Sequence, residues 1–78
     1  MKKIIIYGKR HCPYCSMAQD LLNAKGLEFE YIDADEESKK FLELAKTHNH
    51  RTVPMIFIDG EFLGGFDTLN ALEKSGSL

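Results

Sequence analysis

The residues best suited to chemistry in this chain are its two cysteines, which stand in the segment Cys12-Pro13-Tyr14-Cys15. Two thiols at this spacing can be oxidised to a disulfide and reduced again. A bond between them would close a very short loop, so it would stabilise the fold by only about 2 kcal/mol. The spacing therefore favours reversible thiol-disulfide chemistry over structural reinforcement.

The residue after Cys12 predicts which thiol is the more reactive. Pro13 suits the first position of a helix, where its missing N–H is not needed, and this places Cys12 at the N-cap. Unpaired backbone N–H groups and the helix dipole at that position favour the thiolate over the thiol. We therefore expect Cys12 to attack a disulfide, and Cys15, turned inward on the helix, to resolve the product. Three groups that could add positive charge precede Cys12, and the sequence leaves open which of them approaches the sulfur: Lys9, Arg10 and His11.

The hydrophobic pattern predicts four strands around this segment. Residues 4–7 form an apolar run that ends at a glycine, which is typical of a strand buried on both faces. Residues 28–32 alternate charged and apolar side chains, as a half-exposed strand does. Residues 55–58 and 61–63 flank Asp59-Gly60, a pair that readily forms the type I′ turn of a hairpin.

Three helices are predicted between and after the strands. The first begins at Pro13 and ends near Gly26. The second follows an acidic segment, residues 33–37, and its apolar face carries Phe41, Leu44, Ala45 and His48. The last contains Leu69 and Leu72, and Asp67 or Thr68 is expected to cap it.

These elements predict an α/β fold over a single domain, residues 1–78, with a four-stranded mixed sheet and three helices in the order βαβαββα. A right-handed crossover makes the first two strands parallel neighbours, with the first strand central in the sheet. A Cys-x-x-Cys motif near a βαβ unit is a thioredoxin-like redox signal, and the whole order resembles a minimal thioredoxin fold.

Two further motifs lie far from the cysteines in the sequence. In Thr52-Val53-Pro54 the proline restricts Val53 to an extended backbone, which can accept a peptide as an added strand. Gly64-Gly65-Phe66-Asp67 places backbone N–H groups at a helix start beside a carboxylate, an arrangement that can hold an amino-acid head group. Taken separately, a strand-start proline and a glycine turn with an aspartate cap explain these motifs equally well.

The three motifs together, in this order, resemble the dithiol glutaredoxins over essentially the whole chain. The resemblance implies catalysis by Cys12 and Cys15, glutathione as reductant and co-substrate, no metal, and a cis Val53-Pro54 bond. It also implies a set of glutathione-binding residues: Lys9, Tyr14, Thr52, Val53, Pro54, Gly65, Phe66 and Asp67. Arg51 is a further cation that could assist Lys9, although its direction is not predictable.

Composition limits the partners. The chain of 78 residues has 10 lysines and arginines against 12 aspartates and glutamates, a net charge of −2, which offers no basic surface for nucleic acid. The N-terminal apolar run is too short for a signal peptide or a membrane helix, so we expect a cytoplasmic monomer without membrane contact. The resemblance implies disulfide-bonded or glutathionylated proteins as partners, with ribonucleotide reductase as one candidate.

Two other functions remain open at this stage. One is a thioredoxin-like hydrogen donor that a flavin-containing reductase reduces directly. The other is an iron–sulfur protein, in which two subunits share a cluster through their exposed cysteines and bound glutathione. Zinc is disfavoured because the two cysteines lack nearby ligands, and we expect structural or solvent-exposed roles for His11, His48 and His50.

Overall fold

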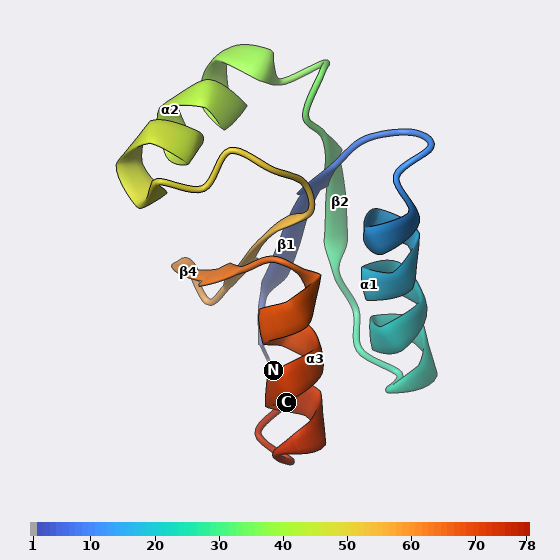
Figure 1. Cartoon of the computed structure of the whole chain (residues 1–78). Helices are drawn as coiled ribbons and strands as arrows, with labels where there is room; N and C mark the ends of the chain where they lie inside the picture. Colours follow the sequence, from blue (N-terminus) through green and yellow to red (C-terminus); the bar gives the residue numbers. More distant parts are fainter. Residues whose placement is uncertain (1) are drawn as a thin grey trace.

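The computed structural model describes residues 2–78, which fold as a sheet with helices on both of its faces (Figure 1). The elements are β1 (Ile4–Gly8), α1 (Pro13–Ala24), β2 (Glu30–Asp33), α2 (Ser38–His48), β3 (Met55–Ile58), β4 (Glu61–Gly64) and α3 (Phe66–Lys74). This is the predicted order βαβαββα, and it confirms the α/β class.

The sheet is mixed, with the strand order β2-β1-β3-β4. Strand β1 pairs in parallel with β2, as the crossover through α1 requires, and antiparallel with β3. Strand β3 in turn pairs antiparallel with β4 across the predicted hairpin. Its turn residues Asp59 and Gly60 have φ angles of 53° and 83°, the positive values expected of a type I′ turn.

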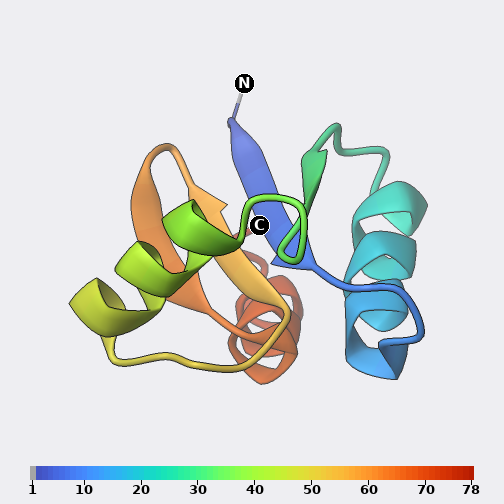
Figure 2. The ribbon, with the colours of Figure 1, turned by 90° about the horizontal axis from the view of Figure 1, so that it is seen from above.

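Alternate residues of the strands contribute to two hydrophobic cores, one on each face of the sheet. Figure 2 shows α2 on one face and α1 and α3 on the other. Ile4 and Ile6 of β1 pack on the face that α1 and α3 cover, together with Leu22 and Leu69. Tyr7 lies on the opposite face, where α2 contributes Phe41 and Ala45 and β3 contributes Met55 and Phe57. The apolar face predicted for the second helix is therefore the one that α2 buries.

The pairing register brings three chain segments together at one end of the sheet. Tyr7, near the end of β1, lies opposite Met55, the first residue of β3. Ile56, the next residue, lies opposite Gly64, the last residue of β4. Three segments therefore meet at this end of the sheet: the loop that leaves β1, the loop that enters β3 and the turn that leaves β4.

Several predicted boundaries shift in the structure. Strand β2 begins at Glu30, two residues later than expected, because Ile5 of β1 pairs first with Glu30. Helix α2 begins at Ser38, directly after the acidic segment, as predicted. The Asp33 carboxylate accepts the N–H groups of Asp35 and Glu36 at 2.8 and 3.3 Å, and this turn leads directly into the helix. Within residues 2–78, no helix has the length and apolar character needed to cross a membrane.

The burial of Tyr7, which is 6% exposed, is expected to make the stability of the protein depend on pH in the alkaline range. Burial, followed by the negative charges of Glu37 and Glu30, raises the pKa of its phenol above the ordinary value. The folded state thus holds this proton more tightly than the unfolded state, so stability falls as pH rises above about 10. Tyr7→Phe should reduce that fall, measured as the free energy of unfolding in urea at pH 7 and pH 11. An equal loss in both proteins would contradict this assignment.

Candidate active site

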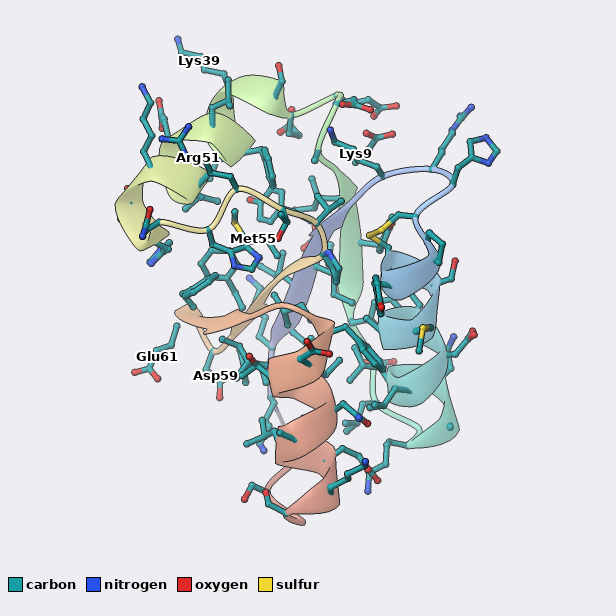
Figure 3. The ribbon with its side chains drawn as sticks, in the orientation of Figure 1. Lys9, Lys39, Arg51, Met55, Asp59 and Glu61 are labelled. Atoms are coloured by element: carbon teal, nitrogen blue, oxygen red, sulfur yellow. A yellow bond between two sulfur atoms is a disulfide. The ribbon has the colours of Figure 1, made fainter. Side chains whose placement is uncertain are left out.

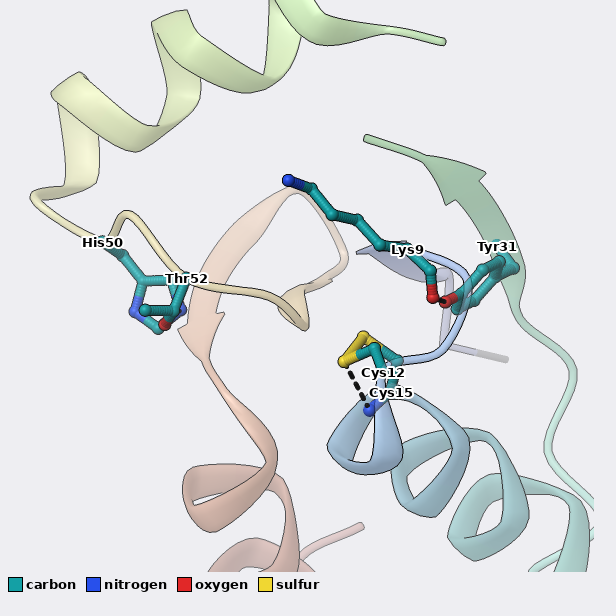
Figure 4. Close-up of a disulfide and its surroundings, with 6 residues drawn as sticks. All are labelled: Lys9, Cys12, Cys15, Tyr31, His50 and Thr52. Carbon is teal, nitrogen blue, oxygen red and sulfur yellow. Dashed lines mark hydrogen bonds between the residues drawn. A yellow bond between two sulfur atoms is a disulfide. The ribbon is translucent and has the colours of Figure 1, made fainter. Parts of the chain in front are cut away.

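Cys12 and Cys15 are joined in a disulfide at the N-terminus of α1, with their Cα atoms 5.2 Å apart (Figure 4). Cys12 is the N-cap residue, as predicted, and its Sγ accepts the backbone N–H of Cys15 at 3.2 Å. The first backbone bond of the helix runs from the Ser16 N–H to the Cys12 carbonyl at 3.1 Å. Because Pro13 has no N–H, the donors left for the sulfur are those of Tyr14 and Cys15.

The two sulfurs differ in accessibility. Cys15 is 1% exposed and belongs to the buried interior, whereas Cys12 is only partly buried. Tyr14, between them, is 57% exposed, and its ring lies 6.0 Å from that of Phe66 at the start of α3. An incoming disulfide can therefore reach Cys12 but not Cys15.

A groove of about 280 Å³ lies beside the cysteines, where the three segments meet. Its walls come from α1, the segment before β3 and the start of α3, and they consist of Tyr14, His50, Thr52, Val53, Pro54, Gly65, Phe66, Asp67 and Thr68. Seven of the eight residues predicted to bind glutathione line this groove, and Lys9 is the exception. The three distant motifs therefore form one surface.

The segment before β3 presents its backbone to the groove. The Val53-Pro54 bond is cis, as the resemblance implies. The Val53 side chain packs against the core beneath α2, while Pro54 is buried. Among the described residues, no backbone hydrogen bond outside the helices and strands involves Val53. Its N–H and C=O are thus placed to pair with an extended ligand.

The start of α3 forms the other wall. Its first backbone hydrogen bond runs from the Leu69 N–H to the Gly65 carbonyl at 3.2 Å, so the N–H groups of residues 66–68 have no partner within the helix. The predicted cap was wrong, because Gly65 and not Asp67 or Thr68 occupies the N-cap. Asp67 instead lies exposed in the first turn, beside these free donors.

Lys9 lies in the loop between β1 and α1, and its Nζ is 3.5 Å from an Asp35 carboxylate oxygen. Both side chains are well exposed, at 44% and 73%, so this ion pair is weak and another anion can displace it. In Figure 4 the Lys9 side chain extends away from Tyr31, toward the side of the molecule where His50 and Thr52 lie. Arg51 lies beside α2, apart from Lys9, and does not line the groove (Figure 3).

Comparison with known proteins identifies the family. A sequence profile described as Glutaredoxin matches residues 4–63. Glutaredoxin 3 of Escherichia coli strain K12 is 42% identical over 78 residues, which is all of this chain and 94% of the relative. The chain belongs to the glutaredoxin family. A probable glutaredoxin of Synechocystis is 44% identical, over 97% of this chain and 88% of the relative.

Solved glutaredoxin structures share the fold. A buckwheat glutaredoxin-glutathione complex superposes with a TM-score of 0.90 at 30% identity, over 99% of this chain and 73% of that one. A dithiolic glutaredoxin of Trypanosoma brucei brucei superposes with a TM-score of 0.88 at 36% identity, over 99% and 82%. With its cysteine pair, this member of the glutaredoxin family is a thiol-disulfide oxidoreductase.

Two groove residues of this glutaredoxin were not predicted as site residues. The Nε2 atom of His50 lies 3.3 Å from the Thr52 Oγ1, and its ring packs edge-on against Phe62. Thr68 projects toward Gly64. Neither belongs to a recognisable motif, and their nearness to the groove follows from the meeting of distant segments. His48 has the structural role predicted for it, since its ring stacks on that of Phe62 at 4.6 Å.

A larger hollow of about 740 Å³ lies at the opposite end of the sheet, near the starts of β1 and β2. It has no residue of the cysteine motif in its shallow walls, which are formed by Lys2, Lys3, Ile4, Asn23, Leu27, Glu28, Phe29 and Glu30. Within residues 2–78, no three His, Cys, Asp or Glu side chains gather as a metal site requires. Tyr14, which stands between the two cysteines, lines the smaller groove and not the larger hollow, and this identifies the smaller groove as the candidate active site.

Gly64→Ala is expected to destabilise the groove wall. Gly64 has a φ of +134°, and an added Cβ would lie 2.8 Å from the Thr68 hydroxyl oxygen. Strain of this kind costs about 1–3 kcal/mol, which urea unfolding would measure. Gly60→Ala is the matched control, since Gly60 has a φ of +83° and open space around it. Equal destabilisation by the two substitutions would contradict a packing role for Gly64.

Proposed function

We propose that this protein is a glutathione-disulfide oxidoreductase that reduces glutathione mixed disulfides and protein disulfides. The observation that carries the proposal is the groove, in which Tyr14 of the cysteine motif faces an open backbone at Val53 and free N–H groups at the start of α3. Glutathione is a tripeptide with a carboxylate at each end, an ammonium group beside one of them and a thiol in the middle. The groove, together with Cys12 and Lys9 outside its walls, offers a partner for each of these groups.

The site residues suggest how the tripeptide lies. The cysteinyl backbone of glutathione pairs with the N–H and C=O of Val53. Its γ-glutamyl carboxylate accepts the free N–H groups at the start of α3, and Asp67 binds the neighbouring ammonium. Lys9 attracts the glycine carboxylate in competition with Asp35. This placement brings the glutathione sulfur to Cys12, beside the ring of Tyr14.

A glutathione mixed disulfide requires only Cys12. The Cys12 thiolate attacks the glutathione sulfur, the S–S bond breaks, and the substrate leaves as a thiolate that takes up a proton. A second glutathione thiolate then attacks the Cys12-glutathione bond, which yields oxidised glutathione and restores the Cys12 thiolate. The Cys15 N–H that lies 3.2 Å from the Cys12 Sγ stabilises this thiolate in the reduced enzyme.

A protein disulfide requires both cysteines. Cys12 attacks one sulfur and forms a mixed disulfide with the protein, and Cys15 then attacks Cys12, which releases the reduced protein. The product is the Cys12–Cys15 disulfide, and two glutathione molecules reduce it in turn. The inward position of Cys15 suits this role, because it can reach Cys12 but not an external sulfur.

Family membership favours this function over the two alternatives. A donor that a flavin enzyme reduces directly has no need of the groove at α3. The shared-cluster function would require two subunits, and we propose a monomer that works in the cytoplasm without a metal. The buckwheat relative was solved with glutathione, which supports the same ligand here. Glutathionylated and disulfide-bonded proteins are the proposed partners, with ribonucleotide reductase as one candidate.

Cysteine substitutions test the separate roles proposed for Cys12, which attacks the disulfide, and Cys15, which resolves the mixed disulfide. Cys15→Ser should retain reduction of a small glutathione mixed disulfide and lose reduction of a protein disulfide, whereas Cys12→Ser should abolish both. The assay couples oxidised glutathione to NADPH consumption through glutathione reductase. Loss of both activities in Cys15→Ser would contradict the one-cysteine route, and an inactive parent protein would overturn the proposed function.

Asp67→Asn tests the ammonium contact. Removing the charge while keeping the size should raise the KM for a glutathione mixed disulfide about threefold to tenfold, because a charge-assisted contact in an exposed site is lost. Glu61→Gln is the matched control, since Glu61 lies exposed on β4 near the hairpin turn, away from the groove (Figure 3). An equal KM in the two variants would exclude Asp67 from recognition.

A further inference from the structure

Tyr31 of β2 reaches the loop that carries Lys9. Its hydroxyl donates a hydrogen bond to the Lys9 backbone carbonyl at 3.2 Å, which Figure 4 shows above the cysteines. This is a side-chain contact between β2 and the segment that leads from β1 to Cys12. Tyr31 lies in none of the motifs that define the groove.

The sheet register explains why Tyr31 can make this contact. Tyr31 pairs with Ile6 of β1, so its side chain lies on the face that α1 covers, and it packs against that core. Gly8, two residues after Ile6, belongs to the same face. The ring of Tyr31 extends along this face, over Gly8, to the carbonyl of Lys9.

A glycine is needed at position 8 because any side chain there would collide with the ring of Tyr31. A Cβ at this position would lie 2.6 Å from the Cζ atom and 2.8 Å from the Cε1 atom of the Tyr31 ring, closer than any side chain allows. Its φ lies outside the left-handed region, so the backbone does not by itself demand glycine there. The absence of a side chain at Gly8 thus leaves the space that the Tyr31 ring occupies.

Two other contacts hold the same loop. The Gly8 carbonyl accepts the Ala34 N–H at 2.8 Å, and the Lys9 ammonium lies 3.5 Å from Asp35. The exposed ion pair engages the Lys9 side chain, whereas the Tyr31 bond engages its backbone. The backbone bond can therefore persist when the ammonium leaves Asp35 for another anion.

We propose that Tyr31 is a positioning residue that fixes the Lys9 backbone, so that the Lys9 ammonium is aimed at the glycine carboxylate of bound glutathione. The inference rests on the proposed glutathione function. Burial and the nearby Asp33 charge raise the pKa of the Tyr31 phenol, so its hydroxyl remains a donor at neutral pH. Tyr31 touches neither the substrate nor the sulfurs and acts only through Lys9.

Tyr31→Phe removes the hydroxyl and keeps the ring over Gly8. We expect it to raise the KM for a small glutathione mixed disulfide about threefold to fivefold, with kcat changed by less than about twofold, as loss of one hydrogen bond predicts. Tyr7→Phe makes the same chemical change on the opposite face of the sheet and should leave both constants unchanged. A purely structural role would lower the melting temperature without moving KM.

A double-mutant cycle tests the route through Lys9. Lys9→Ala should raise the same KM, and adding Tyr31→Phe to Lys9→Ala should then have no further effect, because the ammonium that Tyr31 positions is gone. An unchanged KM in Tyr31→Phe, or an equal further rise in the Lys9→Ala background, would overturn the inference. The proposed function would fail separately, through an inactive parent protein.

Discussion

The active site depends on the register in which β3 pairs with both of its neighbours. Opposite Met55, at the start of β3, lies Tyr7, one residue before β1 ends, and opposite Ile56 lies Gly64, where β4 ends. Regular antiparallel pairing sets Tyr7 opposite Met55, whereas a register shift between Ile56 and Phe57 sets Gly64 opposite Ile56. A slip by one residue would move the buried side chains of a strand to its other face. The packing of the two hydrophobic cores therefore fixes the strand register, and with it the relative positions of the segments that form the groove.

Helix N-termini contribute to the site twice, with different chemistry. At α1, Cys12 occupies the cap, and a backbone N–H of the first turn donates to its sulfur. At α3, a glycine occupies the cap and makes no side-chain bond, so the donors of the first turn stay free for a ligand. One helix end thus supports the nucleophile, while the other provides an anion site beside Asp67.

The loops of the site are supported from behind by residues that no motif contains. His48 and His50 pack against Phe62, and His50 also contacts Thr52, so this aromatic cluster holds the segment that enters β3. Strand β2 and the turn after it hold the loop that leaves β1, through contacts to Gly8 and Lys9. Cys12 and Val53 are thereby fixed from opposite sides of the groove.

The sequence by itself determined the features that depend on short spacing. The order of strands and helices follows from hydrophobic periodicity, the place of Cys12 at a helix cap from Pro13, and the hairpin from Asp59-Gly60, all of which are local properties of the backbone. Three motifs sufficed to predict the family and seven of the residues that line the groove.

Only the tertiary structure decided which groups meet across strands. The N-cap of α3 is Gly65 and not the predicted Asp67 or Thr68, because the chain enters this helix directly from the end of β4. His50 lies in the groove, where it contacts Phe62 and Thr52. The Tyr31 hydroxyl can bond to the Lys9 carbonyl because Gly8 has no side chain. Such contacts join residues far apart in the sequence, so their geometry depends on strand register and side-chain volume, which local spacing does not encode.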